Sequence, residues 1–377
     1  MSVVSATSPG LLHEFIDLPA KLYAGDPCWV PPYRPQLAET FDRRRNPFFR
    51  VAEIEHFIAF DARGTPVGRI AACVHHAYNR CLNRRHAFFG FFESIPDAGV
   101  AGALLRTVEE WAAARGLDTV AGPYSYCPTQ DAGLLVEGFD APPALLQTYN
   151  PAYYERLICD AGYERCFTIQ TFAGPVDPLR GRAEALIEQG RRLARAHGLT
   201  IRTLDRRRLN AERTRLLALF NDAFNHNREV VPIEDEVFRF QTAAFEAIVD
   251  PRLVLIAERD GAPVAFVLAL PNFNEVLLRY RGRITLPMLV RRKAVLRSIR
   301  SAVIVLIGAR QEVHGLGLSR VLLAELLRQG LDAGYERFHT TWVDEQNGTM
   351  LSGIRRFQQP RPDKRYGIYR KALAVAH

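Results

Sequence analysis

The chain contains two segments with the same predicted elements almost 200 positions apart, and this repeat constrains its fold more than any other feature. Residues 58–68 and 256–265 each predict a strand, a glycine-containing tight turn and a second strand. A helix and then a buried strand follow each hairpin: 100–114 and 118–121 in the first half, 318–333 and 337–343 in the second. Elements that recur at nearly one offset favour two copies of one domain over two unrelated α/β units that coincide.

The boundary between the copies is predicted near residue 178, where Pro175, Pro178 and Gly181 cluster. We therefore expect an N-terminal domain over 1–178 and a C-terminal domain over 179–377. Each is expected to be an α/β unit with a central mixed sheet flanked by helices. The further elements predicted for the second copy are a helix over 182–196, a strand over 199–204, helices over 211–225 and 233–248, a strand over 302–307 and a closing strand over 366–372.

The composition is that of an ordinary globular protein. The 377 residues carry a net charge of +8, which suits an anionic ligand, an anionic membrane surface or nucleic acid without choosing among them. All six cysteines lie within the first 166 residues and none forms a CxxC pair, so reduced thiols are expected rather than a disulfide framework or zinc site. The pair His75-His76 lacks a third ligand at convincing spacing, and no metal site is expected.

The sequence shows neither a signal peptide over residues 1–21 nor an apolar stretch long enough to span a bilayer. We therefore expect a cytoplasmic protein that is either free or peripheral on the inner membrane.

Residues 302–319 contain the motif that is most informative about function. A β-branched strand runs into a short loop, and Gly315-x-Gly317 opens the next helix. Free backbone N–H groups and the positive end of the dipole make such a helix N-terminus a pyrophosphate site, although a plain tight turn would have the same pattern. The loop is not a Walker motif, because no Gly-Lys-Ser/Thr follows. It is not a dinucleotide fingerprint, because Arg320 takes the third glycine position.

This arrangement resembles the GNAT acyltransferase family, in which a Gln/Arg-x-x-Gly-x-Gly/Ala loop holds the pyrophosphate of acyl-CoA. The loop of this chain matches both glycines, but Glu312 replaces the usual Gln or Arg, a departure for which Arg310 or His314 would have to compensate. Residues 342–350 resemble the family's fifth strand and the helix after it, and 364–371 resemble its closing strand. The resemblance implies acyl-CoA as a co-substrate with no permanently bound cofactor. The residues implied to bind acyl-CoA are Ile307, Gly308, Ala309, Arg310, Gln311, His314, Gly315, Leu316, Gly317, Leu318, Ser319 and, at the pantetheine arm, Asn347.

The first copy lacks this loop. Residues 91–100 contain no Gly-x-Gly and two acids, so we expect a degenerate copy that does not bind CoA. Landmarks at 46–49, 89–93, 133–140 and 149–154 resemble a group of bacterial tandem GNAT-like proteins that includes the ceramide synthases. That resemblance implies N-acyl transfer to a long-chain sphingoid-type amine.

A basic insertion is predicted over residues 276–300, where a compact GNAT domain would have a short turn. Eight bases lie between Arg279 and Arg300, and no acid occurs between Glu275 and Glu312. Bases interleaved with apolar residues suit peripheral docking on an anionic membrane. The alternatives are a solvated helix face, or bases that serve the phosphates of CoA.

The long loop over residues 122–143 is predicted to form part of an amine-binding wall, because a long loop without its own regular structure is usually functional or disordered. The candidates for substrate binding are Tyr126, Asp131, Glu137 and, beyond the loop, Asn150. The alternative is an ordered loop that packs one copy on the other.

Direct acyl transfer needs a neutral amine, a polarised thioester carbonyl and a proton for the thiolate. A backbone N–H near 307–309 is expected to polarise the carbonyl. The candidate bases are Glu345, Glu93 and His314, and the candidate acids are Tyr366 and Tyr369. In many GNAT enzymes a tyrosine on the helix after the Asn is the acid, but residues 350–357 contain none.

Three hypotheses of function therefore remain open. The first is N-acylation of a long-chain amine, with acyl-CoA or acyl carrier protein as the donor. The second is acetylation of a small amine, and the third is acyl-CoA binding without catalysis. A nucleic-acid partner is not expected, because the basic segment lacks a helix-turn-helix, zinc or RNP pattern.

Overall fold

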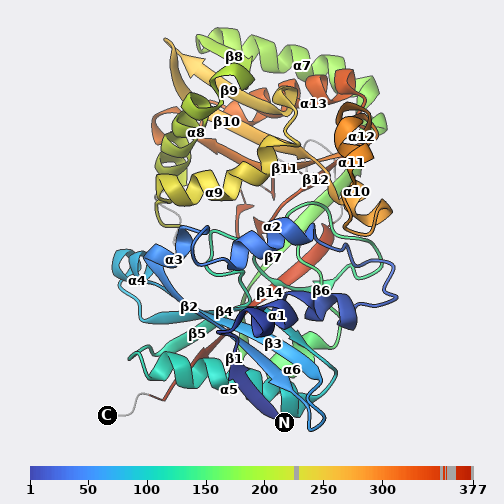
Figure 1. The fold of residues 1–377 in the computed structure, drawn as a ribbon. Helices are drawn as coiled ribbons and strands as arrows, with labels where there is room; N and C mark the ends of the chain where they lie inside the picture. Colours follow the sequence, from blue (N-terminus) through green and yellow to red (C-terminus); the bar gives the residue numbers. More distant parts are fainter. Residues whose placement is uncertain (225–228, 349–350, 353, 355–361, 375–377) are drawn as a thin grey trace. The chain divides into compact units, whose positions relative to one another are not determined.

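The computed structural model describes residues 1–224, 229–348, 351–352, 354 and 362–374 and consists of two compact units (Figure 1). Unit 1 comprises Met1–Pro143, Gln147–Ile169 and the chain from Lys364 onward, whereas unit 2 comprises Ala144–Leu146 and Gln170–Asp363. This division differs from the predicted domains 1–178 and 179–377 chiefly at the C-terminus, because the closing strand pairs within unit 1.

Unit 1 is built on a mixed sheet whose strands follow the order β1-β2-β3-β4-β5-β14-β7. Strands β4 and β5 are parallel and are joined by helix α5, and the pairs β1–β2, β2–β3, β3–β4 and β5–β14 are antiparallel. The strands are β1 (Ser2–Ser5), β2 (Ala52–Phe60), β3 (Pro66–His75), β4 (His86–Ser94), β5 (Thr119–Gly122), β6 (Leu134–Glu137), which pairs with β14, the first half of β7 (Glu164–Pro175) and β14 (Pro362–Ala372). The helices are α1 (Pro9–Leu22), α2 (Arg34–Phe41), α3 (Phe48–Val51), α4 (His76–Leu82), α5 (Ala98–Ala113) and α6 (Tyr154–Asp160).

Unit 2 repeats this plan with the strand order β7-β12-β11-β10-β9-β8. Its strands are the second half of β7, β8 (Leu199–Thr203), β9 (Val254–Arg259), β10 (Ala262–Pro271), β11 (Ser301–Ala309), β12 (Arg337–Thr340) and β13 (Val343–Asp344), which pairs with β7. Its helices are α7 (Asp177–Ala196), α8 (Leu209–Phe224), α9 (Asp235–Glu246), α10 (Asn274–Arg279), α11 (Leu286–Val290), α12 (Arg292–Arg297) and α13 (Leu318–Ala333), with 3₁₀ turns at Arg206–Arg208, Pro251–Leu253 and Gln311–Val313. Within the described residues, no helix combines the length and the apolar character needed to cross a bilayer.

The predicted α/β fold with a repeated domain is confirmed. The hairpins β2–β3 and β9–β10 correspond, and so do the crossovers β4-α5-β5 and β11-α13-β12, whose outer strands are parallel in both units. Helix α13 has the predicted bounds. The amphipathic spacing explains the packing: Leu104, Leu105 and Val108 bury one face of α5, and Val321 and Leu322 do the same for α13.

Three details differ from the sequence-based expectation. The segment predicted as a linker does not form one, because Gly174 and Pro175 end β7 in pairing with β12. The predicted strand over 337–343 divides into β12, which pairs with both β11 and β7, and β13, which pairs with β7. The sequence also predicts a helix that opens at Asn150, as at Asn347, whereas α6 begins at Tyr154. The helix predicted after Asn347 runs into residues 349–350, 353 and 355–361, which lie outside the described part of the chain.

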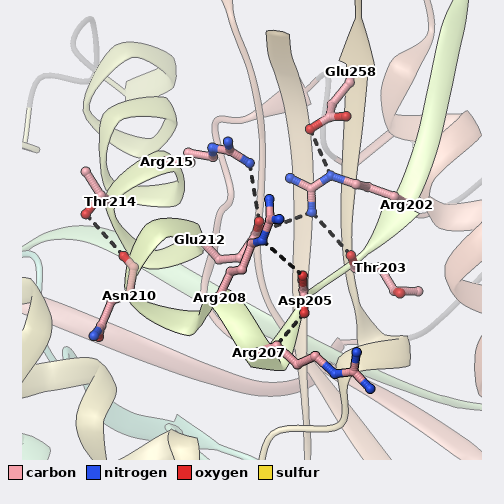
Figure 2. A network of polar contacts seen from close by, with 10 residues as sticks. All are labelled: Arg202, Thr203, Asp205, Arg207, Arg208, Asn210, Glu212, Thr214, Arg215 and Glu258. Atoms are coloured by element: carbon pink, nitrogen blue, oxygen red, sulfur yellow. Dashed lines mark hydrogen bonds and ion pairs between the residues drawn. The ribbon is translucent and has the colours of Figure 1, made fainter. Parts of the chain in front are cut away.

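A polar cluster ties β8, β9 and α8 together in unit 2 (Figure 2). The buried carboxylate of Glu212 accepts a hydrogen bond of 2.8 Å from Arg202, and Arg215 lies 3.5 Å from its other oxygen. The guanidinium of Arg202 also donates to Glu258 at 2.8 Å. Burial of a charge is costly unless it is paired and hydrogen-bonded, so this cluster depends on both partners of Glu212 being present.

We expect Glu212→Ala to lower the free energy of unfolding by about 2 kcal/mol, because Arg202 loses one of its two carboxylate partners and keeps Glu258. Urea unfolding measures this loss. Glu188→Ala is the control, since Glu188 is exposed in its ion pair with Arg195; a change of under about 0.5 kcal/mol is expected there. Equal effects of the two substitutions would contradict the role of the buried carboxylate.

Candidate functional site

Strand β11 carries a bulge that opens one of its edges. Its pairing with β10 shifts from Leu268↔Leu306 to Ala269↔Ile304, so Val305 is the extra residue. Strand β12 pairs with β11 only as far as Ile304, and the backbone N–H and the hydroxyl of Thr341 then bond the carbonyls of Ile304 and Val305. Beyond this point, no described strand pairs with the edge of β11 that faces away from β10.

The peptide groups of Ile307 and Ala309 face this open edge. The N–H of Arg310 donates to the carbonyl of Val264 on β10 at 2.9 Å. Along an antiparallel strand, the N–H and C=O groups of successive residues point alternately towards the partner strand and away from it. Those of Arg310 and Gly308 point towards β10, so those of Ile307 and Ala309 point away from it. His314 agrees with this assignment, since its Nε2 lies 3.0 Å from the carbonyl oxygen of Ala309. A carbonyl only accepts, so Nε2 carries the proton, and a neutral His314 has its lone pair on Nδ1.

The loop after β11 presents the N-terminus of α13 without a side-chain cap. Gly315 and Gly317 adopt left-handed φ angles of 82° and 73°. A Cβ at Gly317 would lie 3.0 Å from Leu193, so a side chain there would be both strained and crowded. The first-turn N–H groups of a helix have no intrahelical acceptor, and with the helix dipole they form an anion site.

Two arginines supply positive charge at this loop. The guanidinium of Arg320 lies 3.9 Å from the position that a Cβ would take at Gly317. Arg310 is half-exposed and lies 3.9 Å from Asp222, so its charge is partly balanced. Glu312, on the 3₁₀ turn, is exposed. The loop therefore combines uncapped amides, two cations and one carboxylate that opposes them.

The chain itself fills the corresponding places in unit 1. Strand β4 also has an irregular register with β3, between Arg69 and Ala71. The backbone of Tyr124 lies against it: its N–H donates to the carbonyl of Phe89, and a Cβ at Gly90 would overlap its carbonyl oxygen. The Asp97 side chain caps α5 by accepting from two backbone N–H groups. Both features that lie open in unit 2 are occupied here.

Glu93, a predicted base, lies in the core of unit 1. One oxygen accepts 2.8 Å hydrogen bonds from the hydroxyls of Tyr23 and Tyr154, and the other lies 3.4 Å from Arg69. Burial raises the pKa of Glu93, and the Arg69 charge opposes that shift. The carboxylate is thus held inside a polar cluster that also stabilises the fold.

The other predicted catalytic residues are divided between the units. Tyr366 and Tyr369 are buried on β14 in unit 1, where the Tyr369 hydroxyl donates to Glu155 at 2.6 Å. Burial raises the pKa of Tyr369 well above its ordinary value. Glu345, half-buried in the turn after β13, and His314 belong to unit 2, as does the exposed Asn347. His314 is itself part of the loop, where its Nε2 lies 3.0 Å from the carbonyl oxygen of Ala309.

The predicted substrate-binding residues have different surroundings in unit 1. Asn150 is buried and bonds the backbone of Leu135 on β6 through both its oxygen and its nitrogen. Glu137 is exposed and lies 3.2 Å from Arg365, and the exposed Asp131 accepts from Ser125 at 3.3 Å. These contacts give Asn150 a structural role and leave Asp131 and Glu137 at the surface.

Tyr126, the fourth of these residues, is buried among aromatic rings. Its hydroxyl lies 2.9 Å from Nε2 of His56, and the rings of Phe48 and Phe91 pack against it. Burial, together with the charges of Arg43 and Arg69, lowers the pKa of His56 to about 3. The imidazole is therefore neutral in the folded protein at neutral pH.

We expect this histidine to make unit 1 sensitive to acid. Below pH 6.5 the unfolded chain binds a proton at His56 that the folded chain does not, so the free energy of unfolding falls as the pH drops from about 6.5 towards 3. The slope from this group is about 1.4 kcal/mol per pH unit. Thermal unfolding of His56→Gln should be less dependent on pH over this range, and an unchanged dependence would contradict the assignment.

Sequence reasoning placed residues 307–309 at the site, but it did not predict that this edge of β11 is open, and it did not assign Arg320 to the site. No residue pattern in the sequence marks the bulge in β11. The interruption between β12 and β13 at Thr341-Trp342 accompanies it. A hollow of 360 Å³ lined by Glu184, Ile187, Glu188, Arg191 and Arg328 lies along α7 and the C-terminal half of α13, and it contains no predicted site residue.

Comparison with known proteins agrees with this geometry. The chain is 30% identical to the bacterial ceramide synthase of Caulobacter vibrioides, over 99% of this chain and 98% of that one. It is 29% identical to protein YghO of Escherichia coli K12, over 96% and 93% of the two chains. No family model matches.

Solved structures resemble the fold. A tandem GNAT protein from the clavulanic acid biosynthesis pathway superposes with a TM-score of 0.58 at 14% identity, covering 100% of this chain and 99% of that one. The glucosamine N-acetyltransferase region of a fungal multi-domain β-N-acetylglucosaminidase gives a TM-score of 0.59 at 14% identity, over 98% of this chain and 38% of that one. The tandem GNAT architecture is thus shared at low sequence identity.

Proposed function

Because the chain belongs to the family of the bacterial ceramide synthase and is an acyltransferase, we propose that it transfers an acyl group from acyl-CoA to a primary amine. We further propose that the donor binds to unit 2. The observation that carries this proposal is the open edge of β11, which leads directly to the uncapped N-terminus of α13. An elongated thioester with phosphates at one end matches both features.

In this proposal, the amides of the donor's pantetheine arm bond the peptide groups of Ile307 and Ala309, as an added strand would. The pyrophosphate accepts from the backbone N–H groups of residues 315–319. Arg310 and Arg320 balance its charge, and Gly308 lets the strand pack tightly, since a Cβ there would lie 2.8 Å from Phe266.

The reaction needs few groups from the protein. The nitrogen of the neutral amine attacks the thioester carbonyl carbon, a C–N bond forms, the C–S bond breaks, and the thiolate takes a proton. A peptide N–H on the open edge of β11 would polarise the carbonyl. His314 through Nδ1 and Glu345 are the candidate bases in unit 2. The other predicted groups, Glu93, Tyr366 and Tyr369, belong to unit 1, where hydrogen bonds occupy the carboxylate of Glu93 and the hydroxyl of Tyr369 donates to Glu155. Within unit 2, the thiolate would take the proton that the base receives from the amine.

For the acceptor we propose a long-chain sphingoid-type amine, supported by the full-length similarity to a protein named for ceramide synthesis. Acetyl transfer to a small amine is the second candidate. The third candidate, an acyl-CoA-binding protein without turnover, rests on two departures from the pattern of catalytic GNAT proteins, Glu312 in the loop and the lack of a tyrosine over residues 350–357.

The experiment that separates these functions is thiol release from acetyl-, hexanoyl- and palmitoyl-CoA, with sphinganine or a panel of small amines in detergent. Release that requires the long-chain amine supports the proposal. Release with small amines alone would assign acetyl transfer. Acyl-CoA binding without release on any amine would assign a binding protein, or a donor such as acyl carrier protein.

We expect Arg320→Ala to raise the KM for acyl-CoA about tenfold, because a charge-assisted hydrogen bond to a phosphate contributes about 1.5 kcal/mol. Arg310→Ala should have a smaller effect, since Asp222 partly balances Arg310. The control is Arg63→Ala, an exposed arginine in the β2–β3 turn of unit 1 with the same loss of charge. Equal KM values for Arg320→Ala and the control would place the phosphates elsewhere.

Removing the opposing carboxylate should have the reverse effect. Glu312→Gln is expected to lower the KM for acyl-CoA about threefold, because an exposed charge interaction contributes under about 1 kcal/mol. The gain should shrink at high salt, which screens exposed charges. Glu14→Gln, an exposed glutamate in unit 1, is the control. An unchanged or higher KM for Glu312→Gln would mean that the carboxylate does not face the phosphates.

A further inference from the structure

Helix α11 turns its apolar side chains to the solvent. Leu286, Leu289 and Val290 have the spacing i, i+3, i+4, which places them on one face, and they are 74%, 58% and 82% exposed. No residue of α11 is buried. Tyr280, at the end of α10, is also exposed. The described chain has six exposed large apolar residues, and four of them lie between positions 280 and 290. An amphipathic helix of a globular unit normally buries this face.

The bases around this face are all exposed, and few of them have a partner among the described residues: Arg279 donates to Ser298 and Arg292 to the carbonyl of Ala247. The eight are Arg279, Arg281, Arg283, Arg291, Arg292, Lys293, Arg297 and Arg300. Within the described chain, Arg300 is the one that approaches a carboxylate, Glu336 at 3.7 Å. The segment is therefore both strongly cationic and apolar at its tip.

The segment is ordered rather than loosely attached. Met288, Val295 and Leu296 pack against the core of unit 2, and Ile299 is buried in it. Glu275 holds the return of the chain by accepting from the backbone N–H groups of Arg300 and Ser301. Figure 1 shows α10, α11 and α12 following one another along one edge of unit 2. The exposed face is thus a fixed feature with its apolar residues on one side and its anchors on the other.

The bases of this segment are poorly placed to serve phosphates at α13. The segment ends where β11 begins, and the phosphate loop follows the other end of β11. A strand of this length extends about 26 Å. The loop moreover has its own arginines, Arg310 and Arg320.

We propose that the exposed face of residues 279–297 is a docking surface for an anionic lipid bilayer, with Leu286, Leu289 and Val290 entering the interface and the surrounding bases meeting the lipid phosphates. Charge complementarity selects this partner, because anionic head groups attract clustered bases while the acyl region accepts apolar side chains. The inference does not depend on the proposed acyl transfer, since binding to vesicles is measured without turnover.

The test is co-sedimentation of the full chain with vesicles of phosphatidylcholine containing about one third phosphatidylglycerol, beside vesicles of phosphatidylcholine alone. Binding is expected to the first kind, with strong weakening at high salt. Neutralising two bases in Arg291→Ala/Lys293→Ala should lower the partition coefficient about 25-fold, because each base near the surface contributes about fivefold. The apolar variant Leu286→Ser/Val290→Ser should lower binding without changing its dependence on salt.

The matched control is Arg63→Ala/Arg207→Ala, which removes the same charge from two exposed positions outside the segment. All four altered residues of the two test variants are exposed, so their thermal unfolding should match the unaltered protein, and folding is checked in this way. Binding that is equal for both base pairs would overturn the proposal, because net charge alone would then explain it. A dimer in sedimentation velocity that Leu286→Ser/Val290→Ser dissociates would also overturn it, since a second copy would then cover the face.

Discussion

The single extra residue Val305 determines what unit 2 presents to a ligand. A strand in the middle of a sheet satisfies its backbone on both sides and offers nothing to bind. At the bulge, β11 separates from β12 after Ile304. Thr341 bonds the carbonyls of Ile304 and Val305 at the point where the two strands separate. The remaining backbone of β11 is paired on one side and open on the other, and the helix that follows begins with uncapped amides. The candidate site is therefore made mostly of main chain, and its side chains adjust charge.

The two units share one fold but differ at the edge of the fourth strand and at the start of the crossover helix, and the local sequence explains the difference. Both have the hairpin, the irregular fourth strand and the crossover helix. In unit 1, Gly90 admits the backbone of Tyr124 against the strand, and Asp97 satisfies the first amides of α5. In unit 2, Gly317 occupies the position before α13 and supplies no side-chain cap, and the equivalent edge of β11 is open. A carboxylate cap and a returning loop thus close in unit 1 the two features that lie open in unit 2.

The sequence predicted the repeat, the α/β class and the bounds of α13, because periodic apolar residues and glycine turns are local signals. It could not predict that β14 pairs within unit 1, since pairing of distant strands depends on the whole sheet. It also predicted that Tyr126, in the long loop, and Asn150, beyond it, bind the substrate, and that prediction stays untested. In the structure, the side chain of Asn150 forms hydrogen bonds with the backbone of Leu135, and the hydroxyl of Tyr126 forms one with the side chain of His56. A polar residue near a motif suggests a ligand, but only the burial and the partners of its atoms decide whether it is available.

The two proposed binding surfaces lie at opposite ends of β11. At one end the cationic segment exposes apolar side chains, and at the other the glycine loop exposes amides. Both surfaces attract phosphate, but they do so by different physics: flexible, hydrated side chains give an attraction that salt screens, whereas fixed amides with a helix dipole give a directional site. The length of β11, about 26 Å, separates the ends of the strand at which the two proposals place lipid head groups and the phosphates of the donor. Under both proposals, the two ligands would therefore not compete for the same charges.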